Sequence, residues 1–125
     1  MDVNNKPKIS VVFGSYNQLE CLKLVLHEYE NQVVAQDLFE VVVVDSSSSD
    51  GTQEFLRSYT PSYNFKAIIQ QNEGKVAARH NAILAARGDY ILVTDSDMIP
   101  HQELVGCHLD AHLSHSSTSC YEGVT

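Results

Sequence analysis

The sequence predicts a single α/β domain whose sheet is mostly parallel and covered by helices on both faces. Short runs rich in β-branched residues alternate along the chain with stretches of helical periodicity, an order typical of parallel sheets joined by helical crossovers. One run, VVVV at residues 41–44, is apolar at successive positions, which indicates a strand buried on both faces. The length of 125 residues suits one domain, spanning residues 1–125.

The first half of the chain predicts two strands and two helices in alternation. Residues 8–15 are β-branched and end in Gly and Ser, which favours a strand. The second strand is expected at residues 38–45, and residues 51–60 predict a short helix that ends before Pro61. Residues 16–32 indicate an amphipathic helix, because apolar side chains recur at helical spacing at Leu19, Leu22, Val25, Leu26 and Tyr29.

The second half continues the alternation. Residues 65–70 predict a third strand, and residues 72–90 contain a helix with Gly88 where a C-cap is expected. The apolar stripe of this helix is expected to include Val76, Ala77, His80, Ile83 and Leu84. Residues 90–95 predict the fourth strand. Proline is tolerated in a first helical turn, so Pro100 is expected to open a helix through about His115, and residues 118–125 are expected to begin a fifth strand.

Composition excludes several classes of protein. The formal net charge of −8 argues against a nucleic-acid partner, because phosphate neutralisation needs clustered Lys and Arg. The three cysteines are odd in number and form no CxxC pair, which favours reduced thiols in the cytoplasm over disulfides or structural zinc. The polar N-terminus resembles no signal peptide, and the longest apolar runs are far short of a membrane span. Peripheral membrane contact stays open.

Polar clusters follow all four predicted strands. They are GSYN at residues 14–17, DSSSSDGT at residues 45–52, NEG at residues 72–74 and DSD at residues 95–97. In open α/β sheets, ligands bind beyond the carboxyl ends of the strands. The sequence therefore predicts a ligand site at this edge of the sheet.

Asp95 and Asp97 are candidate metal ligands. In an extended segment, side chains at i and i+2 point the same way, about 6 to 7 Å apart. Mg²⁺ and Mn²⁺ prefer oxygen ligands, and two carboxylates suit an ion that is shared with a diphosphate. The alternative is that an aspartate caps the helix after Pro100. Spacing alone favours neither interpretation.

Other residues of these clusters have two interpretations each. Asp45 ends a buried strand, where desolvation must be offset, and it could accept hydrogen bonds from a base or a sugar hydroxyl. Asp50 is better explained as a turn and helix-cap residue. Tyr16 offers a stacking surface for a base, although Ser15 and Asn17 are also suitable helix caps.

Two basic residues and a group of histidines complete the candidates. Lys75 and Arg79 share a helix face that could meet a nucleotide, although such residues more often lie on a solvated face. Four histidines lie close together near the end of the sequence, at His101, His108, His112 and His115. No third metal ligand is evident beside any pair of them, so we do not expect a metal site there.

Together, ISVVFGSYNQ, FEVVVVDSSSSDGT and NEGKVAARHNAILAARGDYILVTDSDMIP resemble the family 2 glycosyltransferases, which have the Rossmann-like GT-A fold. The resemblance covers nearly all the chain. It implies transfer of a sugar from a nucleotide diphosphate sugar, with UDP-sugars favoured, and commonly with inversion. The implied metal ligands are Asp95 and Asp97, with Mn²⁺ or Mg²⁺. The implied nucleotide-sugar contacts are Ser15, Tyr16, Asn17, Asp45, Lys75, Arg79 and Asp95.

The chain departs from the family pattern in three ways. The family's RNxG motif appears here as RHNA at residues 79–82. The family often has two aspartates where this chain has Asp45 and Ser46. The family's catalytic domains also continue well past this point, to an acceptor site and an acidic general base. No residue is nominated as that base among Glu103, Asp110 and Glu122. We therefore expect a GT-A domain that is incomplete at its C-terminus.

These departures leave two functions open. The first is a glycosyltransferase or its donor-binding part, with a lipid-linked or membrane-surface acceptor left open. The alternative is a non-catalytic fragment that binds nucleotide sugars. An incomplete domain exposes strand edges, so we expect dimerisation or limited stability of the isolated chain.

Overall fold

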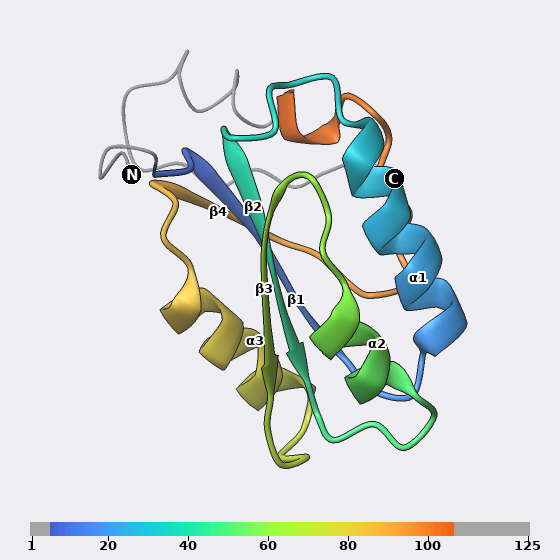
Figure 1. Cartoon of the computed structure of the whole chain (residues 1–125). Helices are drawn as coiled ribbons and strands as arrows, with labels where there is room; N and C mark the ends of the chain where they lie inside the picture. The colour runs from blue at the N-terminus through green and yellow to red at the C-terminus, as the bar shows by residue number, and fades with distance from the viewer. Residues whose placement is uncertain (1–5, 107–125) are drawn as a thin grey trace.

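The computed structural model describes residues 6–106, which form a four-stranded sheet with three helices (Figure 1). Every strand pair is parallel, in the order β3-β2-β1-β4. The strands are β1 (Ile9–Ser15), β2 (Phe39–Asp45), β3 (Asn64–Ile69) and β4 (Tyr90–Val93). The predicted parallel α/β architecture is confirmed.

Helices cover both faces of the sheet. They are α1 (Leu19–Glu28), which continues into the 3₁₀ turn η1 (Tyr29–Asn31), α2 (Thr52–Ser58) and α3 (Lys75–Ala85). Figure 1 shows α1 and α2 on one side of the strands and α3 on the other. None of the helices in residues 6–106 has the length and apolar character that crossing a bilayer requires.

Strand β2 lies between β1 and β3, and all of its side chains are buried. On the face covered by α1 and α2, Val41 and Val43 pack with Phe13, Leu22 and Tyr29. Complete burial of such an aliphatic or aromatic side chain contributes about 1.5–3 kcal/mol. This central strand is therefore a rigid base for the loops that follow it.

Helix α3 packs through alanines rather than through the predicted stripe. Ala78 and Ala82 are buried against the sheet, while Val76 and Leu84 are 80% and 70% exposed. The helix lies so close to β1 that a Cβ added at Gly14 would stand 2.8 Å from the Cβ of Ala78. Only small side chains fit this gap, which explains why the larger apolar residues face away.

Gly88 does not cap α3, contrary to the sequence prediction. The cap position is Ala86, which has an extended backbone, and Gly88 instead crosses the amino end of β1. A Cβ at Gly88 would lie 2.7 Å from the Ser10 amide nitrogen and 2.8 Å from the Ile9 carbonyl carbon. The sequence requires glycine here because two backbone segments touch.

A buried carboxylate closes the amino end of the sheet. Glu40 is 2% exposed and accepts hydrogen bonds from the Ser10 hydroxyl at 2.5 Å and the Arg87 amide at 2.6 Å. The Gly88 amide donates to the same Ser10 hydroxyl at 2.8 Å. These contacts fix the segment that leads from α3 into β4.

The last described helical residues begin at Leu104 rather than at Pro100. Gln32 sets this start, because its side chain donates to the His101 carbonyl at 2.7 Å and accepts from the Val105 amide at 3.0 Å. The rest of the predicted helix, the predicted fifth strand and three of the late histidines lie outside the described residues.

Candidate functional site

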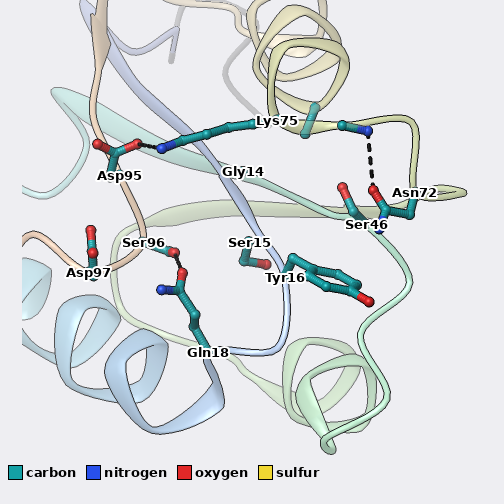
Figure 2. Close-up of a pocket in the computed structure, with 12 residues that line it drawn as sticks. Gly14, Ser15, Tyr16, Gln18, Ser46, Asn72, Lys75, Asp95, Ser96 and Asp97 are labelled. Carbon is teal, nitrogen blue, oxygen red and sulfur yellow. Dashed lines mark hydrogen bonds and ion pairs between the residues drawn. The ribbon is translucent and has the colours of Figure 1, made fainter.

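A cleft of about 320 Å³ opens at the carboxyl ends of the strands (Figure 2). It is lined by Gly14, Ser15, Tyr16, Gln18, Ser46, Asn72, Gly74, Lys75, Ala78, Asp95, Ser96 and Asp97. All four polar clusters that the sequence analysis identified contribute to this lining. The expectation that they meet at one edge of the sheet is therefore confirmed.

Two loops follow β1 and β2, at residues 15–19 and 45–52. Backbone amides of each loop donate hydrogen bonds to the other loop. The Ser46 amide donates to the Ser15 carbonyl at 3.0 Å, and the Asn17 amide donates to the Ser48 hydroxyl at 2.8 Å. The Ser49 amide donates to the Asn17 side-chain oxygen at 2.8 Å. We call this pair of loops the clasp.

Asp50 joins the first turns of two helices within the clasp. It accepts the Leu19 amide of α1 at 3.0 Å, the Thr52 amide of α2 at 3.2 Å and the Thr52 hydroxyl at 2.5 Å. The hydrogen bond from the Thr52 hydroxyl is the main cause that lowers the pKa of Asp50, with the Leu19 amide adding to it. Asp50 is therefore the turn residue that accepts the first amide of α2, although the N-cap position itself is Gly51. The same carboxylate serves α1 in place of Ser15 or Asn17.

Asp45 lies behind the cleft wall. It is fully buried and accepts hydrogen bonds from the Ser15 hydroxyl at 2.8 Å, the Ser48 amide at 2.9 Å and the Ser48 hydroxyl at 2.6 Å. The structure therefore does not show the predicted access of Asp45 to a base or ribose. Its neighbour Ser46 lines the cleft instead.

Four residues of the clasp line the cleft: Ser15, Tyr16, Gln18 and Ser46 (Figure 2). The Tyr16 residue is 50% exposed, as a stacking surface requires, while Ser46 is 4% exposed. Within residues 6–106 the Ser46 hydroxyl has no hydrogen-bond partner, so it is available to a ligand. Asn17 is exposed but lies outside the lining.

The basic residues of α3 meet Asp95. Lys75 Nζ lies 3.3 Å from Asp95 Oδ1, and Arg79 Nη2 donates to the same oxygen. Burial raises the pKa of Asp95, but the hydrogen bonds and charges of Arg79 and Lys75 outweigh it and hold the pKa below its usual range. Lys75 lines the cleft and Arg79 does not. No described hydrogen bond joins the Asp95 side chain to an amide of the segment that follows, so the structure does not show the alternative role as a helix cap.

Asp97 is exposed to the cleft and has no hydrogen bond or ion pair with another residue of the described part of the chain. Between the two aspartates, Ser96 is 3% exposed and donates to the Gln18 side-chain oxygen, which fixes the acidic loop to the start of α1 (Figure 2).

The donor set fits a shared metal ion. The described contacts of Asp95 all use Oδ1, so its second oxygen has no partner within residues 6–106, and both Asp95 and Asp97 line the cleft. No group of three or more His, Cys, Asp or Glu residues suited to a metal occurs within residues 6–106. Two carboxylates of this kind suit Mg²⁺ or Mn²⁺ when phosphate oxygens and water complete the shell.

Four polar lining residues were not predicted as individual ligand contacts: Gln18, Ser46, Asn72 and Ser96. Each stands next to a residue or inside a turn that the sequence analysis singled out. The sequence signal that could have identified these residues is therefore their position just after a predicted strand. A single polar side chain has no spacing pattern that would indicate a ligand contact.

Comparisons with known proteins were made by sequence and by structure. The family model described as Glycosyl transferase family 2 matches residues 10–120. The glycosyltransferase AglE of Haloferax volcanii is 33% identical over 99 residues, covering 78% of this chain and 33% of AglE. The uncharacterised glycosyltransferase YfnE of Bacillus subtilis is 37% identical over 106 residues, covering 84% of this chain and 27% of YfnE. The chain thus spans about a third or less of the length of these relatives.

Solved structures give the same similarity. TarS of S. aureus in complex with UDP-GlcNAc superposes with a TM-score of 0.80 at 29% identity, covering 86% of this chain and 32% of that protein. The mannosyltransferase PcManGT from Pyrobaculum calidifontis, in complex with GDP-Man and Mn²⁺, superposes with a TM-score of 0.71 at 29% identity, covering 78% of this chain and 30% of that protein.

Proposed function

The chain belongs to glycosyl transferase family 2, and from this premise we propose that it forms the nucleotide-sugar-binding portion of a metal-dependent, inverting glycosyltransferase. The observation that carries the proposal is the cleft, which brings Tyr16, Lys75, Asp95 and Asp97 together beyond the parallel strands. A stacking ring, an ammonium group and paired carboxylates match the three parts of a metal–nucleoside diphosphate.

Each part of the ligand has a matching side chain. The Tyr16 ring would stack on the base, and the Lys75 ammonium would pair with the diphosphate. Asp95 and Asp97 would hold Mn²⁺ or Mg²⁺, which supplies Lewis-acid stabilisation of the charge on the departing diphosphate when bound. An acidic protein can therefore bind an acidic ligand, because a cation and a lysine separate the like charges.

A uridine diphosphate sugar is the favoured donor. The structure of S. aureus TarS holds UDP-GlcNAc, whereas that of PcManGT holds GDP-Man, so guanosine is the competing base. Calorimetry should show UDP binding that is tighter in the presence of Mn²⁺. Equal affinity for UDP with and without Mn²⁺ would contradict the metal role.

Asp97→Ala tests the acidic loop directly. We expect it to weaken Mn²⁺-dependent UDP binding at least about 100-fold, since even outer-shell partners of metal sites contribute roughly 10–100-fold in metal affinity. Asp37→Ala is the matched control, because Asp37 is an exposed aspartate outside the cleft. Unchanged UDP affinity in Asp97→Ala would remove this residue from the site.

The second candidate function is binding without turnover. The chain spans about a third or less of the length of the relatives it matches, and the sequence analysis nominates no residue as the general base. Release of UDP from a UDP-sugar in the presence of an acceptor would support the transferase. Tight UDP-sugar binding with no release would support the binding module.

The predicted self-association of the isolated chain also has a structural basis. Strand β4 is outermost in the described sheet, and Ile91 and Val93 on it are 40% and 45% exposed. Such an edge pairs readily with another chain. Light scattering should show dimers or larger species, and a stable, monodisperse monomer would contradict this. The acceptor and a cytoplasmic location stay predictions.

A further inference from the structure

We propose that Asp45 is a positioning residue that fixes Tyr16 and Ser46 toward the base of the nucleotide without touching the ligand. This inference rests on the proposed function for the identity of the ligand. It rests on the geometry of the clasp for the role of the carboxylate.

Asp45 is the meeting point of the two loops. Its Oδ1 accepts the hydroxyls of Ser15 and Ser48, and its Oδ2 accepts the Ser48 amide. The Ser48 hydroxyl in turn accepts the Asn17 amide. A continuous chain of hydrogen bonds therefore runs from the loop after β1, through Ser48 and Asp45, back to the end of β1.

Tyr16 and Ser46 each precede a residue whose backbone conformation needs such support. Asn17 directly follows Tyr16 and has φ of 50°, and Ser47 directly follows Ser46 and has φ of 58°. Residues with side chains rarely adopt this left-handed conformation unless neighbouring contacts enforce it. The Ser47 hydroxyl also donates to the Gln70 carbonyl at 2.6 Å, which adds β3 to the same support.

A buried carboxylate suits this task. Its two oxygens can accept several hydrogen bonds at once. Asp45 forms three of them within the clasp, and it faces serine hydroxyls and an amide rather than the cleft. The carboxylate thus orders the loops in advance of ligand binding, and the loops carry the contacts to the base.

Asp45→Asn tests the proposal on the full chain. The amide retains the shape but lacks one acceptor oxygen, so we expect UDP affinity in the presence of Mn²⁺ to fall about tenfold, the scale of one charge-assisted hydrogen bond. Affinity for Mn²⁺–pyrophosphate should stay unchanged, because that ligand would contact only Lys75, Asp95 and Asp97. Equal losses for UDP and pyrophosphate, or no loss for UDP, would overturn the proposal.

Glu40→Gln is the matched control. Glu40 is a buried carboxylate at the opposite end of β2 and also accepts a hydroxyl of β1. It should lower the melting temperature while leaving UDP affinity unchanged. If Glu40→Gln reduces UDP affinity as much as Asp45→Asn does, the effect is one of general stability and the proposal is overturned.

A second variant guards against failure of Asp45→Asn to fold. Asn17→Gly keeps the left-handed backbone accessible and removes only the side-chain acceptor of the Ser49 amide. It should also weaken UDP binding and spare pyrophosphate binding. Unchanged UDP affinity in this variant would overturn the role of the clasp.

Hydrogen exchange without nucleotide separates this inference from the proposed function. Asp45→Asn should speed amide exchange at Ser48 and Ser49 relative to amides of β2, whether or not UDP binds. If wild type binds no nucleotide, the proposed function fails, and exchange still decides whether Asp45 orders the loops. Unchanged exchange at both residues would overturn the inference.

Discussion

Ser10 and Glu40 face each other across the amino ends of β1 and β2, and Ser15 and Asp45 do so across the carboxyl ends. Both acids are buried, and both accept the hydroxyl of the facing serine. At the amino end, the remaining partner is Arg87, which donates from its amide and its guanidinium Nε and belongs to a segment distant in sequence. At the carboxyl end, the remaining partner is Ser48, from the loop that follows β2.

The difference in partners determines what each end can do. A distant segment packed onto Glu40 fills the space above the strands, and Gly88 touches the backbone of β1. A loop that folds back onto its own strand leaves the neighbouring strand ends uncovered, and the cleft opens there. The same serine–acid pair therefore stabilises a closed end of the sheet and shapes an open one.

Gly88→Ala should have the largest effect and act on the closed end alone. An added Cβ would stand 2.7 Å from the Ser10 amide nitrogen, so backbone must move, and we expect a loss of about 3 kcal/mol in the free energy of unfolding. Urea denaturation measures this loss. UDP affinity of the folded protein should stay close to that of wild type, because Gly88 lies at the end of the sheet opposite the cleft. A loss below about 1 kcal/mol would show that the closed end is loosely packed.

Gly14→Ala acts at the open end of the sheet, where it should reduce UDP affinity as well as stability. Its Cβ would meet the Cβ of Ala78 at 2.8 Å, and α3 can shift to relieve this contact. We expect a stability loss of about 1–2 kcal/mol. The shift also moves Lys75, so UDP affinity should fall by roughly tenfold, one lost charged contact. If Gly14→Ala reduces stability and spares UDP binding, the two ends respond alike and the comparison fails.

The pH dependence of Asp95 should give the smallest effect. Its folded pKa is lowered, so its ion pairs stabilise the protein fully above the unfolded pKa, about 3.9, and lose this effect as pH falls through the folded pKa. Asp95→Asn should cost less than about 1 kcal/mol at pH 6, because the pairs are partly exposed. Urea denaturation should show this difference shrinking toward about pH 3. A difference that grows on acidification would contradict the ion pairs, and high salt should reduce it at about pH 6.

The elements of the fold could be predicted from sequence because each depends on local pattern. The β-branched runs of β1 to β3 and the spacing of Leu22, Val25 and Leu26 carry their own signals. The acid loop was also predictable, since Asp95 and Asp97 follow a strand directly. Such patterns indicate which edge of the sheet binds a ligand.

Three features could not be predicted, because they depend on contacts between distant segments. Gly88 is explained only by Ser10, and the alanine face of α3 only by Gly14. Whether Asp45 or Ser46 faces the cleft depends on where the strand ends, since neighbouring side chains point to opposite faces. If the predicted end of the strand moves by one residue, which is within the error of a sequence-based boundary, Asp45 and Ser46 exchange their roles.

The single carboxylate of Asp50 receives the leading amides of both α1 and α2. Neither helix can therefore fray at its start without releasing the support of the other. We expect the two first turns to open as one cooperative unit, with matching protection of their amides against exchange. The cooperative unfolding unit beside the cleft would thus be larger than either short helix alone.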